Sequence, residues 1–292
     1  MGPDHPECPQ RLDVITDMLM TLRVLDLLAH SEAPKANREA LLRVHDAHYL
    51  ESLERIVPEK GYSAIDLDTR MCPNTLKAAR FAAGSAVQAI DEVMNGQVRN
   101  AFCAVRPPGH HATRDTAMGF CFYNNVAVAA AHAIAEYDLE RVAILDFDVH
   151  HGNGTDEIFE DEQRVKLFSL FEADLYPLER GKEPSGDGVY IALSAGSGSE
   201  ALRAAVESTW LPALEAFEPQ LVLVSAGFDA HVQDEMSSLA FTDADFEWLT
   251  QLCLDVAERH AGGRVVSLLE GGYDLESLAR CAAQHIKLLA RL

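Results

Sequence analysis

Basic residues are scarce in this sequence. Its 292 residues include 24 Lys and Arg against 46 Asp and Glu, which gives a formal net charge of -22. The acidic residues are spread along the chain and do not form a tail. Nucleic-acid binding requires a basic surface that contacts phosphates, so the composition argues against DNA or RNA as a partner. An acidic surface is compatible with a cationic substrate, although ordinary solubility explains the charge equally well.

Long apolar runs and paired cysteines are also missing. The most apolar helical candidate, VAVAAAHAIA (126–135), is too short to span a membrane and contains a histidine. The first residues, MGPDHPECPQRL, contain no apolar segment typical of a secretory signal. Six scattered cysteines without a CxxC pair predict reduced thiols and a cytoplasmic location.

Motifs of two common enzyme classes are absent: there is no GxSxG elbow and no phosphate-binding P-loop. The stretch GSGSEA (196–201), between a short strand and a helix, has the form GxGxxA. The acidic residue expected about 20 positions later is missing, so we interpret this stretch as a loop and a helix cap.

Short β-branched runs alternate with helical patterns. The predicted strands lack the alternation of a half-exposed sheet, which favours a parallel sheet covered on both faces; they are 100–105, 141–147, 164–170, 221–226 and 264–270. A first helix has Leu12, Ile15, Leu19 and Leu22 on one face, and further helices are predicted at about 74–94, 124–137, 199–217 and 246–260. Thr242 and Asp245 form a capping-box signal before the last of these. We therefore predict one α/β domain over residues 1–292, with a mostly parallel sheet flanked by helices on both faces.

Ionisable side chains follow four of the predicted strands. Because the carboxyl ends of parallel strands lie at one edge of a sheet, we expect these side chains to meet in one crevice; they are His110, His111, Asp146, Asp148, His150, His151, Asp229 and Tyr273. Asp148 and His150 are two residues apart, so in extended chain they point to the same side and can bind one ion. Asp229 is a candidate third ligand. Two carboxylates and one imidazole leave coordination positions open, as in a catalytic metal site, and both zinc and iron(II) tolerate this set.

The sequence as a whole resembles the zinc-dependent histone deacetylase family of the arginase–deacetylase superfamily, and its class II and bacterial branch most. The matching stretches occur in the family's order and cover essentially the whole chain: HPECPQRL, RPPGHHA, GFCFYNN, LDFDVHHGNGT, SAGFDAH and LLEGGYDL. The resemblance implies the arginase–deacetylase fold and hydrolysis of acylated amines.

The resemblance also implies roles for individual residues. Asp148, His150 and Asp229 would bind the divalent metal, usually zinc, which polarises the amide carbonyl and activates a water. His111 would act as general base and then as general acid. His110, held by Asp146, would be its electrostatic partner. Tyr273 would donate a hydrogen bond to the tetrahedral oxyanion.

Further implied residues lie along the substrate path and behind the metal. Gly119, Phe120 and Tyr176 would line a tunnel for the aliphatic stem of the substrate, and Asp68 would hold the substrate backbone at the rim. The resemblance implies a structural potassium ion, contacted by Asp146, Asp148, His150, Ser169 and Leu170.

The sequence departs from the family pattern at several points. Asn153 stands where some relatives have a second aspartate beside a catalytic histidine. The tunnel loop reads LYPLERG (175–181) and the gate region reads QDEMSS (233–238). In some relatives an acidic residue at the gate position, at the rim of the tunnel, favours polyamines as substrates. The resemblance places the apolar Met236 at this position, which implies acyl-lysine. A shift of the alignment by one residue would place Glu235 there and imply polyamines. Because the chain begins almost at HPECP, we expect the family's usual first strand to be missing.

We hypothesise a metal-dependent amidohydrolase that removes acyl groups, acetyl above all, from lysine-type amines of peptides or proteins. An acetylpolyamine deacetylase is the alternative of the same class, and a catalytically weak acyl-ligand-binding protein is the alternative of another class. A two-manganese ureohydrolase is disfavoured because the ligands for a second metal are lacking. The sequence leaves open the natural substrate, the acyl length, the metal loaded in the cell and the oligomeric state.

Overall fold

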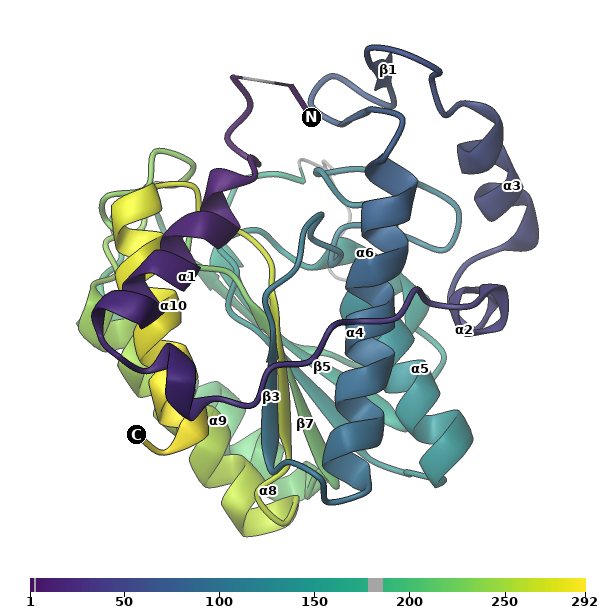
Figure 1. Ribbon diagram of the computed structural model, residues 1–292. Coiled ribbons are helices and arrows are strands. Elements are labelled where there is room, and N and C mark those ends of the chain that lie inside the picture. Colours follow the sequence, from purple (N-terminus) through teal and green to yellow (C-terminus); the bar gives the residue numbers. More distant parts are fainter. Residues whose placement is uncertain (3, 178–185) are drawn as a thin grey trace.

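A parallel six-stranded sheet forms the centre of the computed structural model, which describes residues 1–2, 4–177 and 186–292 (Figure 1). The strand order is β3-β8-β7-β4-β5-β6. The strands are β3 (Asn100–Cys103), β4 (Val142–Asp146), β5 (Val165–Glu172), β6 (Val189–Leu193), β7 (Leu221–Ala226) and β8 (Val265–Leu269). All five predicted runs are strands, and β6 is the short strand before the 196–201 loop. A small antiparallel pair that the sequence did not predict, β1 (Ser63–Ala64) and β2 (Arg70–Met71), lies apart from the sheet.

The central strands are apolar on both faces because both faces are covered. In β4, Ala143 and Leu145 belong to the hydrophobic core on one side of the sheet, whereas Val142 and Ile144 belong to the core on the other. All four side chains are fully buried. Burial of one such aliphatic side chain contributes about 1.5–3 kcal/mol to the stability of the fold. Because successive residues of β4 alternate between the two cores, this burial fixes the strand in the sheet.

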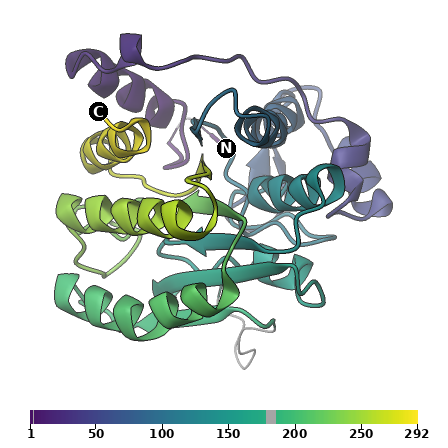
Figure 2. The same cartoon turned by 90° about the horizontal axis from the view of Figure 1, so that it is seen from below.

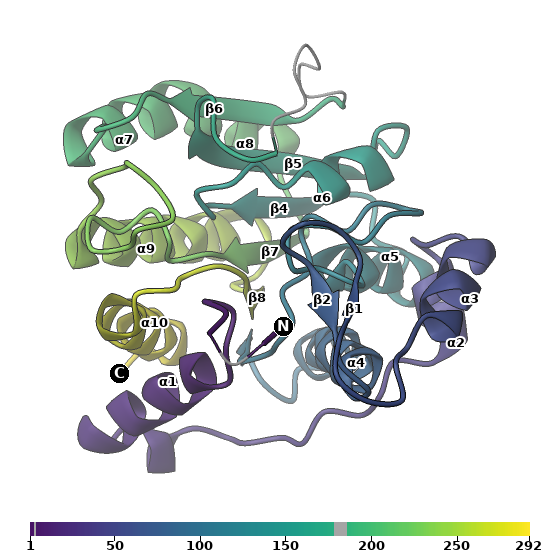
Figure 3. The ribbon, with the colours of Figure 1, turned by 90° about the horizontal axis from the view of Figure 1, so that it is seen from above.

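Two helical layers cover the sheet, as Figures 2 and 3 show from below and from above. The first core includes side chains from α1 (Gln10–Thr21), α7 (Ser199–Ala205), α8 (Leu211–Phe217), α9 (Asp243–His260) and α10 (Leu275–Ala290). The second core includes side chains from α4 (Thr75–Met94) and α5 (Asn125–Tyr137). The remaining helices are α2 (Arg38–Leu42), α3 (Ala47–Arg55), α6 (Asn153–Ile158), the 3₁₀ turn η1 (Leu25–Leu27) and the π-helical turn η2 (Val206–Trp210), which joins α7 to α8. The predicted α/β architecture is confirmed.

Two helix predictions differ in outcome. The capping box before α9 is confirmed, because the backbone N–H of Thr242 donates to Asp245 Oδ2 at 2.9 Å and the helix begins at Asp243. In α1, Ile15 and Leu19 are buried, but Leu22 is 47% exposed. The prediction for Leu22 was wrong because the helix ends at Thr21, so the last position of the apolar stripe no longer faces the sheet.

The path of the chain determines where a site can form. From β4 the chain proceeds outward through β5 to β6, then returns through β7 and β8 on the other side of β4. The direction of strand order therefore reverses between β4 and β7. In open parallel sheets such a reversal opens a crevice at the carboxyl ends of the strands. Among the described helices, none is long and apolar enough to cross a membrane.

Candidate active site

A cavity of about 570 Å³ opens at the carboxyl edge of the sheet. Leu67, at its mouth, is 91% exposed, whereas His111 and His150, at its floor, are almost completely buried. Every residue predicted for the tunnel and its rim contributes to the lining: Asp68, Gly119, Phe120, Tyr176 and Met236. Tyr273 lines the cavity as well. The structure thus brings together residues from six separate loops.

Three predicted metal ligands lie beneath the cavity floor. One donor atom from each of Asp148, His150 and Asp229 lies within 4.8 Å of the other two. His150 Nδ1 is 3.0 Å from Asp148 Oδ1 and 3.2 Å from Asp229 Oδ2. Asp229 Oδ2 is buried and accepts no hydrogen bond, so it remains free to bind a cation. This donor set fits zinc or iron(II), with positions left for water and substrate.

Backbone N–H groups hold the two carboxylates in place. Gly271 N–H donates to Asp148 Oδ2 at 2.8 Å, and Val149 N–H donates to Asp229 Oδ1 at 3.0 Å. A Cβ atom at position 271 would lie 2.0 Å from Asp229 Oδ2. Only glycine therefore permits this close approach, which explains the first glycine of the EGGY stretch.

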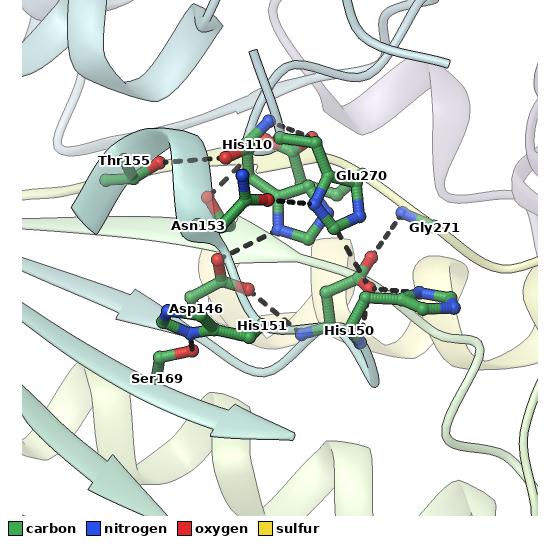
Figure 4. A network of polar contacts seen from close by, with 12 residues as sticks. His110, Asp146, His150, His151, Asn153, Thr155, Ser169, Glu270 and Gly271 are labelled. Carbon is green, nitrogen blue, oxygen red and sulfur yellow. Dashed lines mark hydrogen bonds and ion pairs between the residues drawn. The ribbon is translucent and has the colours of Figure 1, made fainter. Parts of the chain in front are cut away.

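Two adjacent histidines, His110 and His111, lie beside this cluster, and each has a different partner. Figure 4 labels His110 and the two partner residues, Asp146 and Asn153. The ring centroids of the two histidines are 4.0 Å apart. His110 Nδ1 is 3.0 Å from Asp146 Oδ2, and His111 Nδ1 is 2.8 Å from Asn153 Oδ1. The first partner is a carboxylate and the second is a neutral amide, so the two imidazoles are in different electrostatic environments.

The pKa values of these two histidines move in opposite directions. Burial alone would lower the pKa of His110, but the charges of Asp148 and Asp146 outweigh it and raise this pKa well above its ordinary value. For His111, burial and the positive charges of His110 and His150 lower the pKa well below its ordinary value. The surroundings therefore favour the charged form of His110 and the neutral form of His111, a combination suited to acid–base chemistry near neutral pH.

The metal-ligand candidates have perturbed pKa values too. Burial opposes charge on His150, but the hydrogen bond with Asp148 and the nearby carboxylate of Asp229 raise its pKa to about 10. Burial and the neighbouring charge of Asp148 raise the pKa of Asp229 to about 6. Burial also opposes ionisation of Asp148, yet the charge of His110 keeps its pKa below the usual range.

The cavity wall contains two residues in the left-handed backbone region, Gly119 (φ 54°) and Phe120 (φ 68°). A Cβ at position 119 would lie 2.3 Å from His111 Cδ2, which explains the glycine. The Phe120 conformation is unfavourable for a bulky residue, and its N–H is held by Thr69 Oγ1 at 3.0 Å. The Tyr176 ring contacts His111 edge-on with centroids 5.1 Å apart. These contacts make an aromatic wall suited to an aliphatic stem.

The structure also places the departures from the family pattern. Met236 lines the cavity, whereas Glu235 is exposed and does not. In the loop LYPLERG, residues 178–181 lie outside the described part of the chain. For the predicted potassium site, Ser169 lies opposite Asp146 in the β4–β5 register, and its Oγ lies 3.1 Å from His151 Nδ1. Potassium binding there stays a prediction.

Several residues at the site were not assigned a role from the sequence. Arg11 is fully buried; its Nε donates to Gly272 O at 2.7 Å, and its guanidinium lies 4.9 Å from the Tyr273 ring centroid. Glu270 Oε2 accepts the N–H groups of Gly109 and His110 at 2.6 and 3.2 Å. Burial raises the pKa of Glu270 to about 7, although the nearby His110 charge opposes this shift. Arg11 lies in the motif HPECPQRL and Glu270 in the motif LLEGGYDL, so these motifs were the sequence signal by which both residues could have been found.

Comparison with known proteins agrees with this geometry. The sequence profile of the histone deacetylase domain family matches residues 5–289. A histone deacetylase-like amidohydrolase of Pseudomonas aeruginosa is 40% identical over 294 aligned residues, which cover 98% of this chain and 76% of the relative. The human polyamine deacetylase HDAC10 is 38% identical, with 98% of this chain and 45% of that protein covered.

A solved structure is also closely similar. The HD domain of HDA15 superposes with a TM-score of 0.91 at 34% sequence identity, over 100% of this chain and 83% of that one. The match therefore extends over the whole fold that positions the site. Taken with the family profile, it shows that this chain belongs to the histone deacetylase family.

Proposed function

We propose that this protein is a metal-dependent amidohydrolase that removes acyl groups, acetyl above all, from lysine-type amines. The observation that carries the proposal is the position of His111, which is hydrogen-bonded to the Asn153 amide, beside a buried cluster of three candidate metal ligands at the floor of one cavity. We further propose that residues 1–292 form one catalytic domain. The six cysteines are all free, which supports a reducing, cytoplasmic location.

Asp148, His150 and Asp229 would hold the divalent ion, zinc by preference, with iron(II) as the other candidate. When bound, such an ion supplies Lewis acidity toward the amide carbonyl and lowers the pKa of water. We also propose potassium behind this cluster, contacted by Asp146, Asp148, His150, Ser169 and Leu170.

His111 is suited to move the proton. Because Asn153 Oδ1 accepts a hydrogen bond from Nδ1–H of His111, the lone pair lies on Nε2. Nε2 would take the proton from the attacking water and deliver it to the leaving amine. His110, whose Nδ1–H donates to Asp146, would remain charged and stabilise negative charge that develops on the substrate.

Tyr273 is suited to stabilise the oxyanion. Burial raises the pKa of its phenol well above the ordinary value, so the hydroxyl stays protonated and remains a donor. The aromatic side chains of Phe120 and Tyr176 would hold the aliphatic stem, and Asp68 would hold the substrate backbone at the rim. An apolar Met236 in the lining favours acyl-lysine.

Acetylated polyamines are the second candidate substrates. The resemblance to a polyamine deacetylase favours them, as do the carboxylates of Asp4 and Asp68 in the cavity lining. A binding protein without activity is disfavoured, because binding an acyl ligand does not require ligands, base and tyrosine together.

The test is amine release from an acetyl-lysine peptide and from N-acetylputrescine, measured before chelation, after chelation and after zinc is added back. We expect zinc-restored hydrolysis with the peptide preferred. Hydrolysis of N-acetylputrescine alone would replace the lysine proposal with the polyamine one. Failure to hydrolyse either substrate, with metal demonstrably bound, would contradict the proposed activity.

A further inference from the structure

A buried carboxylate outside the reacting groups joins two loops at the cavity. Asp234, in the loop after β7, is 5% exposed. Its Oδ2 accepts the backbone N–H groups of Tyr273 at 2.6 Å and Asp274 at 2.9 Å. Its Oδ1 accepts the backbone N–H of Met236 at 3.0 Å. One side chain therefore binds both the loop that carries the tyrosine and the loop that carries the gate residue.

The tyrosine loop needs such an anchor because of its sequence. Tyr273 follows Gly271 and Gly272, and Gly272 has a φ of 115° that other residues rarely adopt. Two consecutive glycines leave the backbone with more freedom than any other pair would. Arg11 above the Tyr273 ring and Phe120 at its edge orient the phenol. The bonds from Asp234 fix the backbone from which that phenol projects.

Asp234 is itself held firmly. Its own N–H donates to His231 O at 2.8 Å. His231 Nε2 lies 2.9 Å from Asp243 Oδ1, which is at the start of α9. On the other side, the two N–H groups that Oδ2 accepts lie directly before α10, where the helix dipole favours a negative charge. Hydrogen bonds to an ionised acceptor are about twice as strong as neutral ones.

We propose that Asp234 is a positioning residue that sets the Tyr273 hydroxyl over the candidate metal site and ties its position to the Met236 gate. The inference rests on the proposed function, because the effect of Asp234 passes through the oxyanion contact of Tyr273. Asp234 does not line the cavity, so it acts through the backbone and has no direct contact with substrate.

The test is a double-mutant cycle between Asp234→Asn and Tyr273→Phe, with zinc content and thermal stability measured for every variant. Asparagine keeps the shape of Asp234, but it turns an NH₂ group toward at least one backbone N–H and removes the negative charge from the remaining hydrogen bonds, which loosens the attachment of the tyrosine loop. We expect Asp234→Asn to lower kcat about 10- to 100-fold with KM nearly unchanged, since a displacement near 1 Å costs about 10²-fold. In the Tyr273→Phe background we expect less than about a 3-fold further loss.

Asp245→Asn is the matched control. Asp245 is also buried and also accepts a backbone N–H, that of Thr242, but it lies at the start of α9 away from the cavity. We expect it to lower thermal stability and to leave kcat nearly unchanged. Should Asp234→Asn fail to fold, Asp234→Glu, which keeps the charge and shifts it by one methylene, takes its place in the cycle.

The outcomes separate the two proposals. Equal fold losses from Asp234→Asn in the wild-type and Tyr273→Phe backgrounds would overturn the positioning role, as would a loss that follows zinc content. If the wild-type protein is active and Asp234→Asn leaves its kcat unchanged, the positioning role is overturned too. Absence of turnover by the zinc-loaded wild-type protein would overturn the proposed function and this inference together.

Discussion

Two groups of buried histidines in this molecule have different partners and behave differently. In the candidate site, His110 and His150 contact carboxylates, and their pKa values rise despite burial. In the structural regions, His45 and His285 contact only neutral groups, and burial lowers their pKa values to about 4 and about 3. Equal burial thus gives opposite protonation states, and the charge of the partner decides between them.

The hydrogen bonds explain why the structural histidines are neutral. His45 Nδ1 donates to Thr113 O at 2.8 Å, and its Nε2 accepts the Asn124 N–H at 2.9 Å. His285 lies between the hydroxyl oxygens of Thr250 and Ser267, at 2.6 and 2.8 Å. A second proton on His45 would face an N–H donor. Burial of a histidine is therefore not by itself evidence of a functional site.

The largest effect is expected from removing a carboxylate in the candidate site. Asp148→Asn keeps the shape of the side chain but removes the charge of a proposed metal ligand that also contacts the His150 ring. We expect more than about a 10³-fold loss of kcat/KM, with loss of bound zinc, because the ion supplies the electrophile. Steady-state kinetics and metal analysis measure this, and near-normal turnover would contradict the mechanism.

A smaller loss is expected from the oxyanion donor. Tyr273→Phe removes one hydroxyl without touching the three metal-ligand candidates, so zinc should remain bound. Loss of one such donor typically lowers kcat about 10²- to 10³-fold. Retained zinc with lowered kcat would separate this residue from Asp148, whereas loss of both would show that Tyr273 instead supports the metal site.

The structural histidines should make the fold sensitive to acid. Their folded-state pKa values lie below the unfolded value of 6.5, so the unfolded chain binds more protons between these limits. Stability from these groups is complete above pH 6.5 and falls as pH decreases toward 4, by about 2 kcal/mol for each histidine at pH 5. Urea unfolding at pH 8 and pH 5 measures the difference.

His285→Gln isolates this effect from that of the acidic residues. Glutamine retains a donor and an acceptor for the two hydroxyls but does not titrate. We expect the variant to be less stable at pH 8 and to show a weaker decrease between pH 8 and pH 5. An identical pH dependence in variant and wild type would show that His285 is not a source of acid sensitivity.

The smallest effect is expected at the gate. Met236→Glu adds a carboxylate to the cavity lining and should shift preference toward N-acetylputrescine by about 5-fold, as one exposed charge contact contributes about 1 kcal/mol. Glu235→Gln is the matched control, because Glu235 is exposed and outside the lining. A preference that responds to Glu235 and not to Met236 would reverse the assignment of the gate.

The sequence determined much of the fold because its signals are local. Buried strands such as 142–146 are continuous apolar runs, and the Thr242–Asp245 capping box set the start of α9. Less local elements were missed. The β1–β2 pair has two residues in each strand, and α10 begins only after the turn at Asp274. Leu22 was misplaced because an apolar stripe does not show where a helix ends.

For the candidate site, the sequence predicted which residues would lie together, since motif residues at strand ends must meet at one edge of a parallel sheet. Only the tertiary structure decided their partners. It placed Met236 and not Glu235 in the cavity, gave His111 a neutral amide and His110 a carboxylate, and joined Asp234 to the Tyr273 loop. The two partners in each of these hydrogen bonds are dozens of residues apart in the sequence. Their distances and burial set the electrostatics, which no local pattern encodes.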